Sequence, residues 1–375
     1  MRTSAIAGSV RRANSRANGW DRWKAFCSAW DADPQLRDLE DPIPFMASYC
    51  YQYRVGTVAA RGRPVGARQA EEAIRFVGQT MHLLGVGDKR YFCRDNCQKA
   101  GTIDTRLSNM WKHWKTEDPP PSRVKPIPMC VLHKAQELAD ADNSLGAKAT
   151  ARMMWTNVFY LCRPGESCAT RYACNFFRMR DVALIKDSVT IDFMRAPASV
   201  VRGATDALLT FTTQKNRHRN ERIGQKASGH RVASPTVAIA EQILHLRANN
   251  AGPDTPLCAF CERGHWFVVT ADMITDLLRR AVAACPECGL EPSDVSARSL
   301  RATGAMALVC AGIDVDHLRL IGRWRSDEVF TYLHVQAEPI YRDLSARMLQ
   351  GGEYNFAPGS QAFELYHAHP DVTYE

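Results

Sequence analysis

The residues between 297 and 334 combine cations and one tyrosine in a way that suits chemistry on a phosphate. The segment reads ARSLRATGAMALVCAGIDVDHLRLIGRWRSDEVFTYLH and places Arg298, Arg301 and Arg323 ahead of Tyr332. A pair of helices that only packs does not need so many cations beside a tyrosine. Guanidinium groups bind phosphate oxygens through paired N–H donors, and a phenolic oxygen can attack phosphorus. The segment therefore favours a phosphate that is cut by a tyrosine.

The local sequence predicts that Tyr332 lies near the start of a helix. Ser326 is a good N-cap, and the acids Asp327 and Glu328 suit the first turn of the helix that would follow. A tyrosine at this position is by itself more typical of a packed core. Its neighbours change that interpretation, because Trp324 and several arginines precede it within a short stretch.

The elements that would position these residues fall into two groups. Residues 20–116 predict several helices, because apolar residues recur every three or four positions. Residues 117–128 hold five prolines and predict an extended linker between domains. Residues 129–349 predict mostly helices, with strands within 182–194 and 206–225 that form one small antiparallel sheet. The expected fold class is therefore mostly α with a small antiparallel β-sheet.

The two ends of the chain predict little packed structure. Residues 1–19 form a basic arm with four arginines and no acid, which fits an arm that contacts DNA, an organelle transit peptide or an inert tail. Residues 350–375 predict a flexible tail.

Bulk composition places the protein among soluble globular proteins. The chain has 375 residues, 45% hydrophobic and 23% charged, and a formal net charge of +8. No apolar run is long enough to predict a membrane span, and no secretory signal is present. The positive charge favours a polyanionic partner but does not identify one.

Thirteen cysteines without a secretory signal predict mostly reduced thiols. Two C-x-x-C pairs, Cys258 with Cys261 and Cys285 with Cys288, are separated by 23 residues. This spacing is somewhat beyond the usual four-cysteine zinc pattern. A structural zinc site and separate thiols both remain open, and separate thiols are favoured.

The chain resembles the tyrosine recombinases, also called phage-type integrases. RSLR at 298–301 takes the place of their His-x-x-Arg motif, and IGRWRSDEVFTY at 321–332 places Tyr332 nine residues after Arg323, where the family has His or Trp. RPGE at 163–166 fits the family's first arginine. The GRW-x-SD motif is similar to the corresponding motif of the crypton-like recombinases, a branch found in eukaryotic mobile elements. The resemblance covers roughly residues 145–345.

The resemblance implies a role for each matched residue. Tyr332 would attack the scissile phosphorus, while Arg163 and Arg301 would hold the non-bridging oxygens. Glu166 would orient Arg163. Lys215, on the turn between the second and third strands, would protonate the leaving 5′ oxygen, with Lys226 as the fallback.

A further hydrogen bond would come from the indole N–H of Trp324 or from Arg323. The cations would supply the positive charge that a metal supplies elsewhere, so no cofactor and no metal are expected. Tyr341 is the next candidate nucleophile.

One departure from the family pattern concerns Arg298, which stands where the family has histidine. Guanidinium binds phosphate but cannot accept a proton near neutral pH. A DNA-binding protein that has lost the chemistry is therefore one alternative, and a type IB topoisomerase-like enzyme is another. A zinc-ribbon interaction protein built on the two C-x-x-C pairs is a third.

The resemblance also implies partners and a location. The expected partner is double-stranded DNA, clamped between the N-terminal helical domain and the catalytic domain, with a homo-tetramer at synapsis and no membrane. The expected location is the nucleus if the mobile-element likeness holds, and the cytoplasm otherwise.

Overall fold

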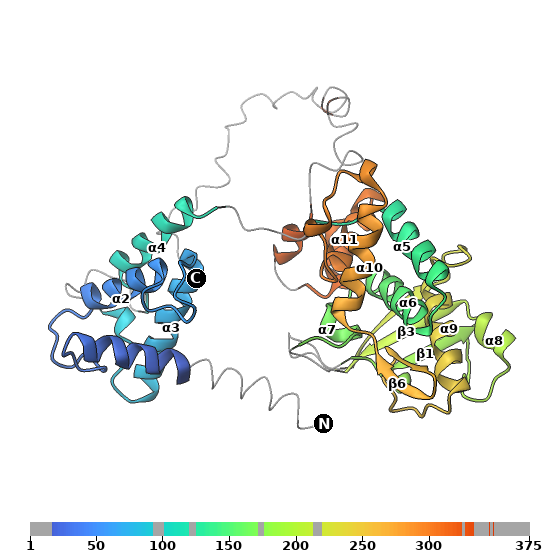
Figure 1. Ribbon diagram of the computed structural model, residues 1–375, viewed down its shortest axis with the longest axis horizontal. Coiled ribbons are helices and arrows are strands. Elements are labelled where there is room, and N and C mark those ends of the chain that lie inside the picture. The colour runs from blue at the N-terminus through green and yellow to red at the C-terminus, as the bar shows by residue number, and fades with distance from the viewer. Residues whose placement is uncertain are drawn as a thin grey trace, which may run out of the picture. The chain divides into compact units, whose positions relative to one another are not determined.

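The computed structural model describes residues 17–92, 101–119, 125–171, 176–212, 220–324 and 327–333, together with residues 345 and 348. The chain divides into two compact units, Met1–Arg123 and Val124–Glu375. Figure 1 colours the first unit blue to teal and the second from green to red. Each unit has a hydrophobic core of its own.

The described part of the first unit consists of helices joined by loops. Residues 17–29 are helical, so the helix begins inside the arm predicted for residues 1–19; residues 1–16 lie outside the described part of the chain. The later elements are α2 (Ile43–Val55), α3 (Ala67–Leu83), the 3-10 helix η1 (Lys89–Tyr91) and α4 (Thr105–Glu117).

The periodicity of α3 explains how this unit packs. Ala70, Ile74, Val77 and Met81 recur at intervals of three and four residues and are all fully buried. They contact a core rich in aromatic side chains, which includes Trp23. The helices predicted within residues 20–116 are therefore confirmed.

The connection between the units is shorter than the predicted linker of residues 117–128. Asp118 belongs to the first unit, because its Oδ2 accepts the Ala67 N–H at 2.6 Å and its Oδ1 accepts from Arg54 at 2.7 Å. Lys125 belongs to the second unit, since its Nζ lies 2.8 Å from Asp294 Oδ2. The Ile127 N–H donates to Thr303 Oγ1 at 2.9 Å. Polar contacts hold both ends of the proline-rich stretch.

The second unit combines helices with two antiparallel sheets. Its α-helices are α5 (Met129–Asp142), α6 (Leu145–Phe159), α7 (Pro164–Ser167), α8 (Ala198–Arg202), α9 (Pro235–Ala248), α10 (Ala271–Ala283), α11 (Ser299–Cys310) and α12 (Val315–Gly322). Its 3-10 helices are η2 (Met179–Asp181), η3 (Pro286–Cys288), η4 (Pro292–Asp294) and η5 (Asp327–Tyr332). Its strands are β1 (Val182–Lys186), β2 (Val189–Thr190), β3 (Asp206–Phe211), β4 (Glu221–Lys226), β5 (Ala259–Glu262) and β6 (His265–Val268).

The larger sheet confirms the predicted one, with strand order β2-β1-β3-β4 and every neighbouring pair antiparallel. In β3, Ala207, Leu209 and Phe211 are buried and alternate with half-buried residues. The fold is therefore mostly α with a small antiparallel sheet, as predicted.

A second sheet, the β5–β6 hairpin, is missing from the sequence prediction. Each of its strands has only four residues. Arg263 and Gly264 form its loop with φ of 51° and 80°, the left-handed pair of a type I′ turn. Arg-Gly is not one of the favoured dipeptides for this turn, so the usual sequence signal is absent.

Helix α6 crosses the core of the second unit and connects the sheet to α11. Trp155, Met153 and Val158 are buried within it, and the side chains along most of its length avoid solvent. Just beyond its end, the Tyr160 hydroxyl donates to the Ala207 carbonyl of β3 at 2.6 Å. On the α11 side Gly304 lies so close that a methyl group there would overlap the Val158 carbonyl. The end of α6 is therefore fixed to both neighbours.

In the described part of the chain, we find no helix whose length and apolar character would let it cross a membrane.

Candidate active site

The end of α6 leads directly into the first candidate residue, Arg163. Arg163 is the N-cap of α7 and has an extended backbone, which the following Pro164 favours. Its backbone N–H donates to Glu166 Oε2 at 2.8 Å, and its Nη1 donates to Glu166 Oε1 at 3.1 Å. The Arg163 side chain is 24% exposed, whereas that of Glu166 is 10% exposed. Arg163 thus keeps a solvent-facing part above a buried carboxylate.

Arg301 enters the same region from the first turn of α11. The residue is buried, and its Nη1 and Nη2 donate to the carbonyls of Leu161 and Gly322, both at 2.5 Å. Its Nε has no hydrogen-bond partner within the described part of the chain. Arg301 therefore joins the end of α6 to the end of α12 and retains an unused donor.

Trp324 covers one face of the Arg301 guanidinium. The Arg301 Cζ lies 4.2 Å from the centre of the Trp324 ring and 5.9 Å from the centre of the Tyr332 ring. The two aromatic rings are 5.2 Å apart at an interplanar angle of 49°. The buried Nε1 of Trp324 has no partner among the described residues. Arginine, tryptophan and tyrosine thus form one contiguous cluster.

Tyr332 closes the 3-10 helix η5 and is half-buried. The predicted helix start at Ser326 lies outside the described residues, so its capping role is not described. Val329 of η5 is fully buried and packs in a small cluster with Leu161, Leu318 and Trp324. This packing fixes the turn that carries the tyrosine.

Arg323 is placed differently from the phosphate donor that the sequence predicted. It is the C-cap of α12, with a left-handed φ of 59°, and its side chain is 2% exposed. Its Nη2 donates to Glu166 Oε2 at 2.9 Å and its Nη1 to the Tyr160 carbonyl at 3.1 Å. Its Cζ lies 3.6 Å from the centre of the Phe211 ring. The guanidinium is thus held inside the protein.

Among the described residues, this cluster holds more cationic than acidic side chains. Arg163, Arg301 and Arg323 carry three positive charges, and the buried carboxylate that contacts two of them is Glu166. Burial, followed by repulsion from Arg163 and Arg323, lowers the pKa of Arg301 from 12.5 to about 10. At neutral pH Arg301 is still charged. A cluster with excess buried cationic charge has the character of a site for an anion.

Two solved structures resemble this fold. One is the crystal structure of XerA recombinase, with 11% identity over 91% of this chain and 100% of that chain and a TM-score of 0.35. The other is residues 82–397 of the Tn1549 transposon integrase in complex with circular intermediate DNA, with 12% identity over 81% of this chain and 84% of that chain and a TM-score of 0.41. No family model and no curated protein matches the chain. These values are too low to transfer a function, so a function has to come from the side-chain geometry.

The other predicted site residues form no hydrogen bond or ion pair with the cluster in the described part of the chain, or lie outside the described residues. Arg298 is the exposed N-cap residue of α11, and its backbone N–H donates to Ser296 Oγ at 3.3 Å. Lys215 and Tyr341 lie outside the described residues. The strand ends that flank Lys215 are Phe211 and Glu221, and Phe211 contacts Arg323.

Lys226 fits the lysine role poorly. It pairs across the sheet with Asp206, at the far end of β3 from Phe211, and its Nζ lies 3.9 Å from Asp206 Oδ1. Five residues of strand separate the two ends of β3, which corresponds to about 17 Å. The alternative lysine thus lies at the wrong end of the sheet, and Lys215 remains the candidate.

The two C-x-x-C pairs do not form a metal site in the described part of the chain. Cys258 and Cys261 belong to the buried start of the β5–β6 hairpin, whereas Cys285 is the N-cap of η3 and Cys288 its last residue, beyond α10. No group of three or more His, Cys, Asp or Glu side chains among the described residues is arranged to hold a metal. Helix α10 separates the pairs, and the structure gives the zinc alternative no support.

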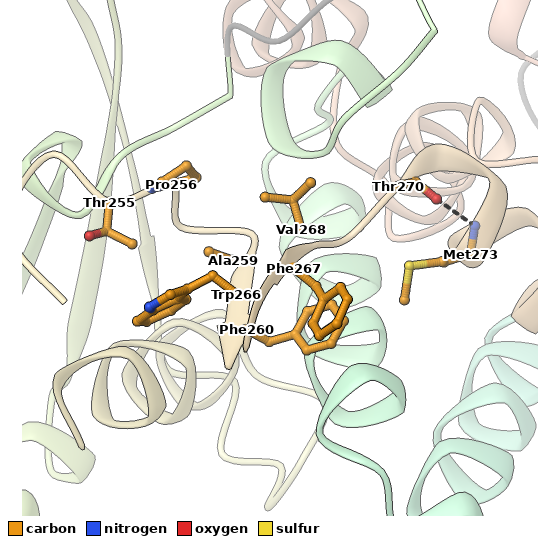
Figure 2. Close-up of a pocket in the computed structure, with 9 residues that line it drawn as sticks. All are labelled: Thr255, Pro256, Ala259, Phe260, Trp266, Phe267, Val268, Thr270 and Met273. Atoms are coloured by element: carbon orange, nitrogen blue, oxygen red, sulfur yellow. Dashed lines mark hydrogen bonds between the residues drawn. The ribbon is translucent and has the colours of Figure 1, made fainter. Parts of the chain in front are cut away.

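A groove of the second unit lies away from the arginine cluster. It has a volume of about 670 Å³ and surrounds the β5–β6 hairpin, where Phe260 and Phe267 stack with ring centres 5.5 Å apart (Figure 2). Trp266 lines its other side. None of the described residues lining it is titratable or belongs to the arginine cluster. This groove is apolar and has no group suited to phosphate chemistry.

Two features of the cluster are absent from the sequence prediction. One is the bond from Glu166 to Arg323, which connects residues 157 positions apart. The other is the need for glycine at position 322, because a methyl group there would overlap the Trp324 ring. The only local signal is the capping pattern in which Glu166 follows Arg163 by three residues.

Proposed function

We propose that this protein is a tyrosine recombinase that cuts and rejoins duplex DNA through a covalent bond between Tyr332 and a 3′ phosphate. One observation carries the proposal: Arg301, Trp324 and Tyr332 pack together beside Arg163. Here the Arg301 Cζ lies 5.9 Å from the centre of the Tyr332 ring, within a cluster of excess positive charge. The remaining roles follow from the chemistry of these side chains.

The first step forms one bond and breaks one. The Tyr332 oxygen attacks the scissile phosphorus and loses its proton to solvent or a nearby base. The bond from phosphorus to the 5′ oxygen breaks, and that oxygen leaves as a hydroxyl once it is protonated. Lys215 is the proposed proton donor. Rejoining reverses these events with a different 5′ hydroxyl, so the phosphotyrosine conserves the bond energy and no ATP is needed.

The arginines stabilise the charge that develops on the phosphate. The exposed part of Arg163 can bind one non-bridging oxygen, and the unpartnered Nε of Arg301 can bind another. The buried Nε1 of Trp324 supplies a further unused donor in contact with the same guanidinium. Fixed donors of this kind need little reorganisation during the reaction.

The proposed substrate is duplex DNA. The net charge of +8 and the cationic cluster suit a polyanion. We further propose that the helical first unit clamps the duplex, that four copies assemble at synapsis and that the protein serves a mobile element. Nuclear residence follows only from this last part of the proposal.

A DNA-binding protein without cutting activity is the second candidate. Both terminal nitrogens of Arg301 already donate to backbone carbonyls, and Arg298 stands where a proton-accepting histidine is expected. In such a protein the cluster would hold the fold and contact DNA without cleaving it. A relaxing enzyme of the type IB topoisomerase class would share the tyrosine chemistry but would not exchange strands.

Covalent capture tests the proposal. The protein is incubated with nicked suicide duplexes made from the DNA that flanks its own coding sequence, and a denaturant-resistant protein–DNA adduct is measured. We expect an adduct with wild type and none with Tyr332→Phe, which should still bind DNA. An adduct that persists in Tyr332→Phe would move the nucleophile elsewhere. Binding without any adduct would favour the second candidate.

A further inference from the structure

Glu166 and Arg323 form a buried ion pair between two distant parts of the sequence. The Arg323 Nη2 lies 2.9 Å from Glu166 Oε2, and the two side chains are 2% and 10% exposed. Glu166 lies in α7, three residues after Arg163, whereas Arg323 is the C-cap of α12 and immediately precedes Trp324. The pair therefore connects the two segments that supply the candidate phosphate ligands.

The Glu166 carboxylate is shared between two guanidinium groups. Oε1 accepts from Arg163 Nη1 at 3.1 Å, while Oε2 accepts from Arg323 and from the Arg163 backbone N–H. An isolated arginine and carboxylate tend to form a two-pronged pair. Because Arg323 and the Arg163 backbone N–H both occupy Oε2, Glu166 contacts the Arg163 guanidinium through Oε1.

The backbone conformation of Arg323 and two further contacts of its side chain hold it in this position. Its backbone adopts the left-handed conformation, its Nη1 donates to the Tyr160 carbonyl, and its guanidinium lies over the Phe211 ring. Both terminal nitrogens of Arg323 are therefore engaged inside the protein, and moving them to a phosphate would break the Glu166 pair. The sequence offered Trp324 or Arg323 for a direct hydrogen bond to the substrate, and these contacts favour Trp324.

We infer that Arg323 is a positioning residue that acts through Glu166 to keep the Arg163 guanidinium available to a phosphate oxygen. This inference rests on the proposed function for its catalytic consequence, but its structural part can be tested without DNA cleavage. Arg323 takes no part in proton transfer and makes no bond to the substrate.

The first test compares adduct formation rates under conditions where circular dichroism shows every variant to be folded. We expect Arg323→Met to slow adduct formation on the order of 100-fold, as for a catalytic group displaced by about 1 Å. Adding Arg323→Met to Arg163→Met should cause little further loss, because both changes disable the same contact. Arg319→Met is the matched control on α12, and it should keep the wild-type rate.

A second variant separates positioning from general damage. Arg323→Met leaves the Glu166 carboxylate free to close on Arg163, whereas adding Glu166→Gln removes the charge that drives this closure. We therefore expect the double variant with Arg323→Met and Glu166→Gln to form adduct about tenfold faster than Arg323→Met alone. A double variant no faster than the single one, or an Arg323→Met variant with the wild-type rate, would overturn the inference.

The third test uses inorganic sulfate as a tetrahedral anion and requires no cleavage. The melting temperature of wild type and of Arg319→Met should rise with sulfate, and this rise should be largely lost in both Arg163→Met and Arg323→Met. An unchanged sulfate response in Arg323→Met refutes the positioning role even if wild type forms no adduct. If the sulfate responses of all variants are as expected but wild type forms no adduct through Tyr332, only the proposed function is refuted.

Discussion

The guanidinium carbon of Arg301 lies 4.2 Å from the centre of the Trp324 ring, and both side chains are buried. A buried cation is costly unless its charge is compensated. Here the indole face and the carbonyls of Leu161 and Gly322 provide the compensation, while Arg163 and Arg323 oppose it. The arrangement keeps a charged group ready for an anion inside the protein.

Replacing Trp324 with alanine should destabilise the second unit. The change removes a buried ring and its contact with Arg301, which together correspond to about 3–5 kcal/mol. Urea unfolding measures this loss. Trp266→Ala is the matched control, because Trp266 is 46% exposed on β6 and its loss should cost much less. Equal losses in the two variants would show that the Arg301–Trp324 stack contributes little.

A methyl group at position 322 should disturb the same stack from the other side. In Gly322→Ala the new Cβ would overlap the indole ring of Trp324, so the ring has to move. Overpacking of this kind costs about 1–3 kcal/mol. We expect a lower melting temperature together with slower adduct formation. Gly252→Ala is the control, because the space around Gly252 is open; if both variants behave like wild type, the ring is not confined as described.

Anion binding should depend on the protonation of Arg301. Its pKa of about 10 implies that sulfate binding is steady from pH 7 to 9 and weakens above about 10. Because this pKa lies below the unfolded value, Arg301 itself favours folding as the pH rises from 10 toward 12.5. Titration of the melting temperature against sulfate at each pH measures the effect.

Arg301→Lys provides the comparison for that pH dependence. Lysine has an unperturbed pKa roughly 2 units below that of arginine, and the same burial would lower it further. The weakening of sulfate binding should therefore move to a lower pH by roughly 2 units. An identical pH profile in the two proteins would place the anion away from position 301.

Buried thiols should make the protein sensitive to alkali. Burial raises the pKa of Cys162 and of Cys168 from 9.0 to about 12. Between pH 9 and 12 the unfolded chain loses these protons while the folded chain keeps them, so stability should fall as the pH rises. Urea unfolding across this range measures the fall, and Cys162→Ala should reduce it.

The same burial predicts which thiols react. At pH 8, Cys162 and Cys168 should resist iodoacetamide in the folded protein, whereas Cys130 and Cys310 are exposed and should be alkylated first. Mass spectrometry of the digested protein identifies the modified residues. Rapid modification of Cys162 in folded protein would contradict the packing around the end of α6.

Local sequence was sufficient for the larger elements. The spacing of apolar residues predicted α3 and most other helices, and alternation predicted β1 and β3. These predictions succeeded because periodicity reports which face of an element is buried. The β5–β6 hairpin was missed because four-residue strands joined by Arg-Gly carry too weak a pattern.

The sequence by itself determined the types and order of Arg163, Arg301, Trp324 and Tyr332, and these are the side chains that we propose bind and attack a phosphate. Only the tertiary structure decided what Arg323 does. Its partners Glu166 and Phe211 lie 157 and 112 positions away in the chain. A periodic pattern reports burial over a few turns, but it carries no information about which distant charge a buried arginine meets, because that depends on the path of the whole chain.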